Sequence, residues 1–249
     1  MAKQENWNYL LNALRKNDDM FKKMRDHFFE IEDGGHPSIE TCVKKAYGDV
    51  CRTLRGINKK IENESDKEVK EGHEADISSY KSDTYSYIEK QISELLNNKN
   101  LEYKDMCKKQ EVFDVWHETT CEGIKEKSEK INKFLDNPFS HGHAQKWLNM
   151  TLKTMLVAEY DEWKELDKLR CVLHIPVDNY IIDAAHNILG IRYERGKKYG
   201  SKYPWSKWKY DIYYSFQKKV RCAVKYRDDY TCPIDWEFNA WMTAIKEKQ

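Results

Sequence analysis

The stretch SKWKYDIYYSFQKKVRCAVKY, residues 206–226, decides the fold class because its apolar side chains recur with the period of an α-helix. Spacings of three and four residues place such side chains on one face of a helix, where they can pack against a core. The stripe consists of Trp208, Ile212, Phe216, Val220 and Ala223. The pattern predicts a helix that begins at Ser206 and buries this stripe.

Similar helical periods recur along the rest of the 249-residue chain, and no stretch of useful length alternates as a half-buried strand does. Only 10 glycines and 5 prolines interrupt them, and an aromatic fraction of 13% argues against disorder. We therefore predict an all-α protein, a single two-lobed domain over residues 1–249. The further predicted helices cover residues 7–33, 38–60, 77–97, 111–135, 144–160 and 162–172, and two more begin at Asp178 and Pro233.

Composition excludes several classes of protein. No apolar run approaches the roughly 18 residues that a membrane-spanning helix needs, and the N-terminal sequence lacks the apolar core of a signal peptide. The 7 cysteines are scattered and include no CxxC pair, so neither a disulfide framework nor a zinc site is predicted. We expect a cytoplasmic protein with reduced thiols and no membrane partner.

The net charge of +1 conceals an uneven distribution of charge. Residues 61–76 carry seven acids against two lysines and have no apolar face, which favours an acidic loop. Residues 192–227 carry twelve Lys and Arg against two acids, interleaved with ten aromatic residues. Such a basic aromatic segment is typical of a nucleic-acid-binding surface.

Asp178 lies in the sequence HIPVDNYIIDAAHN, residues 174–187, where a helix is predicted to begin. Pro176 favours extended backbone before it, and Val177 can pack ahead of the first turn. Asp178 is therefore expected at the N-cap. An ordinary cap would contribute about 1 kcal/mol, whereas a carboxylate held there can also act in catalysis.

Lys146 is expected in the first turn of the helix that follows SHGH, residues 140–143. The positive end of the helix dipole disfavours a protonated lysine there, which suits a nucleophilic amine. A phosphate contact or a solvated lysine is the simpler alternative.

Together these elements resemble the helix-hairpin-helix DNA glycosylase superfamily. The match covers about residues 138–190 and is nearest in style to the archaeal 8-oxoguanine DNA glycosylase type, in which a lysine opens one helix and Ile-Pro-Val-Asp follows after a longer segment. Here Gln145-Lys146 precedes Asp178 by 32 residues. The hairpin PFSHGH, residues 138–143, has one glycine where the family has two, and Asn179-Tyr180 replaces the more common His or Arg.

The resemblance implies that Lys146 attacks the sugar carbon that bears the base and that Asp178 stabilises or activates at the same carbon. It also implies a double-stranded DNA partner with a flipped base, a monomer, and no cofactor. The expected DNA contacts are His141, Gly142, His143, Gln145, Lys197, Lys198, Lys202, Lys207 and Lys209, with Tyr199, Tyr203 and Trp205 as base-stacking residues.

The predicted function is therefore a DNA glycosylase, with or without a strand-nicking lyase step. Asp178 could instead activate water, which would release the base without nicking the strand. The alternatives are a non-catalytic helical module that binds nucleic acid through residues 192–227 and a helical scaffold for a protein partner. Histidines 141, 143, 174 and 186 lack the spacing of a metal site, so no metal is predicted.

Overall fold

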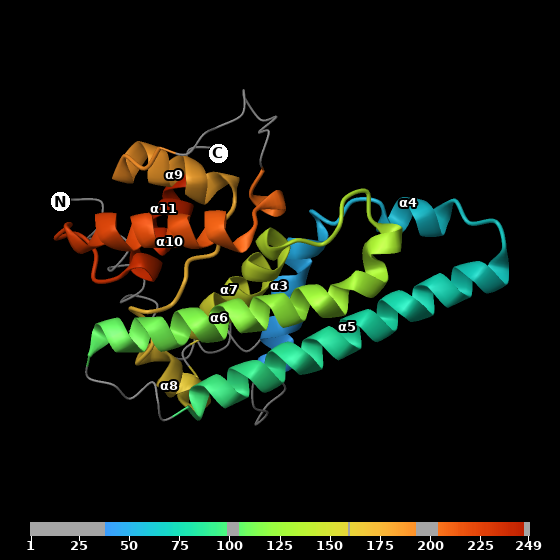
Figure 1. Ribbon diagram of the computed structural model, residues 1–249, viewed down its shortest axis with the longest axis horizontal. Helices are drawn as coiled ribbons and strands as arrows, with labels where there is room; N and C mark the ends of the chain where they lie inside the picture. Colours follow the sequence, from blue (N-terminus) through green and yellow to red (C-terminus); the bar gives the residue numbers. More distant parts are fainter. Residues whose placement is uncertain (1–37, 99–104, 159, 193–203, 247–249) are drawn as a thin grey trace.

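The computed structural model describes residues 38–98, 105–158, 160–192 and 204–246, and the regular structure within them is helical throughout (Figure 1). The prediction of an all-α protein is confirmed. The helix predicted at 7–33 lies outside the described residues. The α-helices are α3 Ile39–Cys51, α4 Ile57–Glu62, α5 Lys67–Leu96, α6 Met106–Ser128, α7 His141–Ala158, α8 Lys164–Asp167, α9 Asn179–Leu189, α10 Tyr210–Lys225 and α11 Pro233–Lys246, with 3₁₀ turns η2 Glu129–Phe134, η3 Asp161–Trp163 and η4 Trp205–Lys207.

Helix α7 is the centre of the fold. It packs against α3, α6, α8 and α10, while α5 lies along α6 and α3, and α9, α10 and α11 pack on one another (Figure 1). Trp147 of α7 is fully buried, donates a 3.0 Å hydrogen bond to the carbonyl of Val43, and packs its ring against those of Tyr47 and Tyr85. The buried apolar side chains form a single cluster around this helix.

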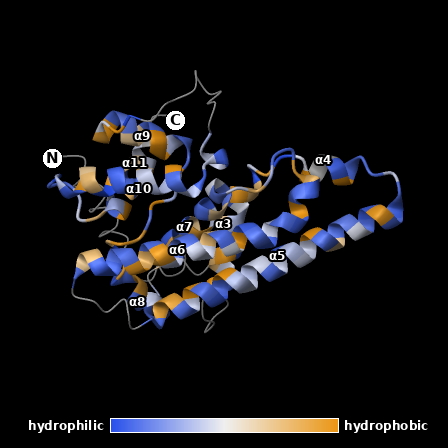
Figure 2. Cartoon of the chain, in the orientation of Figure 1, coloured by the Kyte–Doolittle hydropathy of each residue, from blue (hydrophilic) through white to orange (hydrophobic). Residues whose placement is uncertain are grey.

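The amphipathic pattern of α5 explains how a very polar sequence builds this core. Its buried residues recur at intervals of three and four, and Figure 2 shows apolar positions alternating with hydrophilic ones along its length. Ile77, Tyr80, Ile88, Ile92 and Leu95 are buried, and Tyr87 is half-buried against the same core.

The acidic stretch 61–76 was predicted to be a loop, and most of it is helical. Only residues 63–66 are non-helical, because Asp66 accepts hydrogen bonds from the backbone N–H groups of Glu68 and Val69 at 2.9 and 3.2 Å and so begins α5 at Lys67. Because its N-terminus is capped, α5 can extend into solvent beyond the turns that pack on the core. The helix predicted over 38–60 is also divided, since Gly56 takes a φ of 109° between α3 and α4.

The helix-hairpin-helix element is not confirmed. His141, Gly142 and His143 form the first turn of α7, and they do not form a hairpin before it. The backbone of η4 packs on this turn: the Gly142 N–H donates to the Trp208 carbonyl at 3.1 Å, and a Cβ at position 142 would clash with the carbonyl of Trp205. Glycine is therefore needed here for close approach of two backbones.

Candidate functional site

Lys146 and Asp178 contact one another between α7 and the N-terminus of α9. The Lys146 Nζ lies 2.7 Å from the Asp178 Oδ2, and the two side chains are 10% and 16% exposed. The other carboxylate oxygen, Oδ1, accepts the backbone N–H of Ile181 at 3.0 Å. The predicted N-cap is confirmed, and the same carboxylate also pairs with the lysine.

Lys146 lies in the second turn of α7, one turn later than expected, because the helix begins at His141. The dipole of a helix acts mainly within its first turn. Its effect on Lys146 is therefore weaker than expected. The neighbouring carboxylate of Asp178 is the nearer electrostatic influence on Lys146.

Gln145 fixes the approach of α9 to α7. Its amide oxygen accepts the backbone N–H of Val177 and its amide nitrogen donates to the carbonyl of the same residue, both at 3.2 Å. Gln145 is fully buried, whereas it was predicted to contact DNA. In the structure it positions the residue next to Asp178.

A second glutamine holds the preceding residues in the same way. The amide of Gln217, from α10, accepts the N–H of Ile175 at 3.1 Å and donates to its carbonyl at 2.8 Å, and Asn149 also donates to that carbonyl. Residues 174–177 are extended and belong to no helix or sheet, so their buried backbone groups need side-chain partners. The two clamps supply them and hold the chain that leads to Asp178.

The other predicted DNA contacts in the first turn of α7 also lie inside the protein. His141 is 3% exposed and its Nδ1 lies 3.3 Å from the Glu122 carboxylate. His143 is 4% exposed, and its Nδ1 accepts the N–H of Ser140 at 3.1 Å. Burial lowers the pKa of His143 to about 4, so it is neutral at physiological pH. Neither side chain is placed at the surface for a phosphate.

The predicted basic and aromatic residues have mixed positions. Lys207 and Lys209 are exposed, as a phosphate contact requires, whereas Trp205 is 7% exposed and packs near His143. Its ring is therefore a core group in this structure. Lys197, Lys198, Lys202, Tyr199 and Tyr203 lie outside the described residues.

A second ion pair lies two helical turns along α7 and was not predicted. Lys153 follows Lys146 by seven residues, and its Nζ lies 2.7 Å from the Glu237 carboxylate of α11, with side chains 8% and 2% exposed. The ring centroids of Phe238 and Trp241 lie 4.5 and 5.1 Å from this Nζ. Burial raises the pKa of Glu237, an effect that Lys153 only partly offsets. The sequence signal for this pair was a second lysine, Lys153, at helical spacing from Lys146 on a buried helix.

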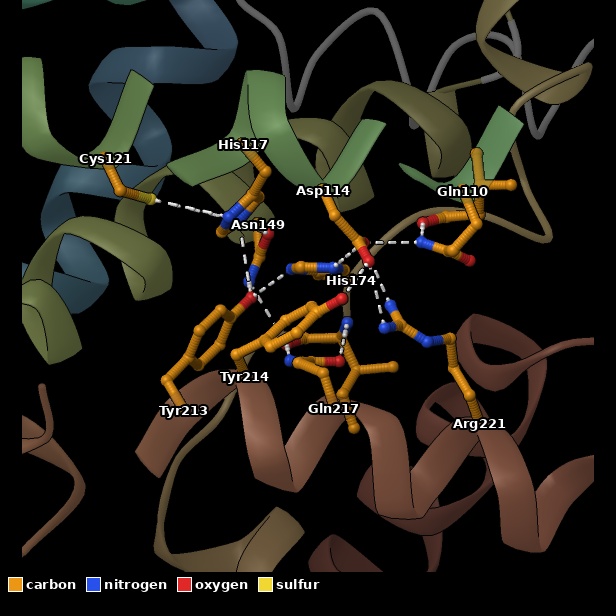
Figure 3. A network of polar contacts seen from close by, with 12 residues as sticks. Gln110, Asp114, His117, Cys121, Asn149, His174, Tyr213, Tyr214, Gln217 and Arg221 are labelled. Carbon is orange, nitrogen blue, oxygen red and sulfur yellow. Dashed lines mark hydrogen bonds and ion pairs between the residues drawn. The ribbon is translucent and has the colours of Figure 1, made fainter. Parts of the chain in front are cut away.

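A buried polar network connects α6, α10 and His174 (Figure 3). The carboxylate of Asp114 receives the guanidinium of Arg221 at 3.1 and 3.2 Å, the Tyr214 hydroxyl at 2.8 Å and the His174 Nε2 at 2.7 Å. A carboxylate can only accept here, so His174 carries its proton on Nε2, and its Nδ1 accepts the Tyr213 hydroxyl at 2.8 Å. Burial lowers the pKa of His174 to about 4, which keeps it neutral.

The same network contains a cysteine, a histidine and an asparagine, the residue types of a cysteine-protease triad. His117 lies 3.7 Å from the Cys121 Sγ and 2.8 Å from the Asn149 amide oxygen (Figure 3). All three residues are buried, and burial raises the pKa of Cys121 and lowers that of His117. A nucleophilic thiolate needs the opposite shifts and an exposed sulfur, so this group is structural.

The part of the chain that the structure describes holds no cluster of metal ligands and no membrane-spanning helix. There, no three His, Cys, Asp or Glu side chains converge as a metal site would require, and none of the helices has the length and apolarity to cross a bilayer. Comparison of the chain with protein-family models, curated proteins and solved structures found no match.

Proposed function

We propose that this protein is a DNA glycosylase in which Lys146 is the nucleophile and Asp178 its partner. The observation that carries the proposal is the 2.7 Å contact between the Lys146 Nζ and the Asp178 Oδ2, two groups that are 32 residues apart in sequence. An ordinary N-cap needs no lysine beside it. A mostly buried ion pair is a poor way to stabilise a fold, because desolvation offsets the attraction.

The pair suits attack on a sugar carbon. Asp178 can accept the proton that Lys146 must lose before its amine becomes nucleophilic. The amine then bonds to C1′ of the flipped nucleotide, the bond from C1′ to the base breaks, and the base leaves with that electron pair and with the proton that Asp178 returns. The positive charge that develops on the sugar faces the Asp178 carboxylate. Opening of the sugar ring moves a proton from the new C1′ ammonium to the ring oxygen and leaves a Schiff base on Lys146, from which elimination can nick the strand.

Exposed cations in the neighbouring part of the chain support a DNA partner. Lys207 and Lys209 flank η4, whose backbone packs against the first turn of α7, the helix that carries Lys146. Lys218 and Lys225 add exposed charges along α10. Neutralising backbone phosphates is the main source of affinity for DNA, and the unstacking of a flipped base must be offset by such contacts.

Borohydride trapping tests the proposal. The protein is incubated with a panel of duplexes that carry 8-oxoguanine, uracil, methylated bases or no lesion, and both free base and covalent complex are measured. Since lysines react generally with open abasic sites, release of base from an intact nucleotide is the decisive signal. We expect Lys146→Gln to abolish trapping and Asp178→Asn to slow base release by at least about 100-fold.

Lys153→Met is the matched control, because this lysine lies on the same helix, is equally buried and is also paired with a carboxylate. It should still form the covalent complex. Trapping that survives Lys146→Gln would refute the assignment of the lysine, and the absence of base release from every duplex would refute the enzyme.

A non-catalytic nucleic-acid-binding module is the second candidate, favoured by a groove on α10. The groove has a volume of about 560 Å³ and pairs the stacked rings of Tyr210 and Tyr214, 5.3 Å apart, with lysine side chains. This function predicts salt-dependent DNA binding that Asp178→Asn leaves unchanged and that Lys218→Gln weakens. The groove is lined by Tyr210, Asp211, Tyr214, Ser215, Lys218, Lys219 and Cys222.

A further inference from the structure

The outer face of α10 carries an aromatic stack that other parts of the protein hold in place. The rings of Tyr210 and Tyr214 are parallel to within 13°, with their centroids 5.3 Å apart. The ring of His141, which is buried in the first turn of α7, meets that of Tyr210 edge-on at 5.3 Å. Both tyrosines line the groove on α10 and are half-buried, so their rings remain partly open to solvent.

Tyr214 is also fixed through its hydroxyl, by the polar network of Figure 3. The hydroxyl donates a 2.8 Å hydrogen bond to the buried carboxylate of Asp114, which also binds the guanidinium of Arg221. The Cζ of Arg221 lies 5.6 Å from the centroid of the Tyr214 ring. A ring that is already held in this way loses little conformational freedom when a ligand binds to it.

Lysine side chains follow the stack along the same side of the helix. Lys218 lies one turn after Tyr214 and Lys225 two turns after Lys218, and both are exposed. The Lys218 Nζ lies 5.4 Å from the centroid of the Tyr214 ring. The residues that line the groove include one acid, Asp211, against two lysines, so the groove favours an anionic ligand.

We propose that the outer face of α10 binds single-stranded nucleic acid, with one base stacked on Tyr214 and successive phosphates on Lys218 and Lys225. The base takes the place of the Lys218 ammonium over the ring, and this exposed side chain turns toward the phosphate of the same nucleotide. The inference rests on the nucleic-acid-binding function proposed above for the groove and names its ligand. It does not depend on the glycosylase activity.

Two features favour a single strand over a duplex or a free nucleotide. In a duplex the bases stack on one another, whereas the bases of a single strand are free to stack on aromatic side chains. Lys225 follows Tyr214 by eleven residues, about 16 Å along the helix axis. A single nucleotide stacked on Tyr214 can reach Lys218 with its phosphate, but a longer strand is needed to reach Lys225 as well.

Fluorescence anisotropy of the full-length native protein with a labelled oligothymidine tests the inference. Tyr214→Leu should weaken oligothymidine binding about tenfold, whereas Tyr214→Phe, which keeps the ring, should change it by no more than about threefold. Neither variant should alter the binding of a duplex of the same length. Lys218→Gln should make the dependence of log K on log salt concentration shallower by about 0.7, the effect of one phosphate contact to a single strand.

Tyr87 and Lys127 provide matched controls on a different pair of helices, α5 and α6. The Lys127 Nζ lies 5.1 Å from the centroid of the Tyr87 ring, which is half-buried like that of Tyr214. We expect neither Tyr87→Leu nor Lys127→Gln to change oligothymidine binding. Circular dichroism of each variant separates loss of binding from loss of fold.

Photo-cross-linking locates the bound base in the native protein, without any substitution. An oligothymidine that carries one 5-iodouracil is irradiated in the complex, and the protein is digested with trypsin. Cleavage after Lys209 and Lys218 releases the peptide 210–218, which should carry the cross-link on Tyr214.

The possible failures are distinguishable. Oligothymidine binding that Tyr214→Leu leaves unchanged, or a cross-link found only outside residues 210–218, would overturn the site on α10 and leave nucleic-acid binding by the chain intact. Equal affinities for oligothymidine and thymidine monophosphate would overturn the strand as the ligand. The absence of binding to every oligonucleotide, single-stranded or duplex, would refute both this inference and the nucleic-acid-binding function on which it rests.

Discussion

Replacing Lys146 and Asp178, singly and together, should show that their contributions to the free energy of unfolding are coupled. Both side chains are mostly withdrawn from water and their charged atoms are 2.7 Å apart. Asp178→Asn keeps an oxygen to cap α9 but leaves the ammonium of Lys146 without its carboxylate. We expect a loss of about 2–3 kcal/mol, below the 3–5 kcal/mol of fully buried pairs because both groups retain some exposure. Asp178→Ala should cost about 1 kcal/mol more, since the cap is also lost.

The reverse substitution should be milder. Lys146→Met leaves Asp178 with the backbone N–H of Ile181 and the positive end of the α9 dipole, so that we expect a loss of about 1 kcal/mol. The double variant leaves no unpaired charge and should lose less than the sum of the single losses, by about 2 kcal/mol.

Urea unfolding followed by tryptophan fluorescence measures each free energy. The exposed pair Lys168–Glu165 has the same 2.7 Å separation with side chains 68% and 44% exposed, and Lys168→Met should change stability by no more than about 0.5 kcal/mol. Losses for Lys146 and Asp178 that add to within about 0.5 kcal/mol would refute the coupling and remove the physical basis for a paired role.

Three further results are expected. Burial holds the pKa of His174 at about 4, against an ordinary value of 6.5, so that between these values the unfolded chain binds a proton that the folded protein does not. Stability should therefore fall from about pH 6.5 downward, by about 3 kcal/mol at pH 4. An unfolding midpoint that does not change between about pH 7.5 and 5 would contradict this. Gly142→Ala should destabilise the protein by about 1–3 kcal/mol, because the new Cβ would clash with the backbone carbonyl of Trp205. Gly72→Ala, where a helical Cβ has open space around it, should instead stabilise the protein by up to about 1 kcal/mol. Equal melting temperatures of the two variants would argue against the close approach of the two backbones at Gly142. Glu237→Ala should lower the free energy of unfolding in urea by about 3 kcal/mol, because it leaves Lys153 without its partner in a buried site. A loss as small as that of a surface substitution would show that Lys153 becomes hydrated in the variant.

Local sequence rules predicted the helices with clear start signals. Ser38 caps α3, Asp178 caps α9 and Pro233 begins α11 as expected, because each signal depends only on the residue and its immediate neighbours. The same rules missed the first turns of α5, where an exposed helix has no apolar stripe to reveal it. They also placed the start of α7 too late, since a helix that is buried on all sides at its N-terminus loses the usual boundary between polar and apolar residues.

The sequence likewise predicted only some of the residues of the candidate site. Its two central residues, Lys146 and Asp178, were selected from the sequence by a resemblance, and the structure brings them into contact. The functions of their neighbours could not be assigned in this way. Gln145 is polar and adjacent to the lysine, so it resembled a DNA contact, yet its amide is used to satisfy the backbone of Val177.

The amino-acid sequence by itself determined that the chain is helical and where the helices with clear start signals, α3, α9 and α11, begin, because helix period and capping are local properties. Only the tertiary structure decided that Asp178 has a lysine as its partner as well as a helix to cap, and that Lys153 meets Glu237. Each of these pairs joins elements whose approach is set by packing around α7, and burial then fixes whether their charges and protons are available for chemistry.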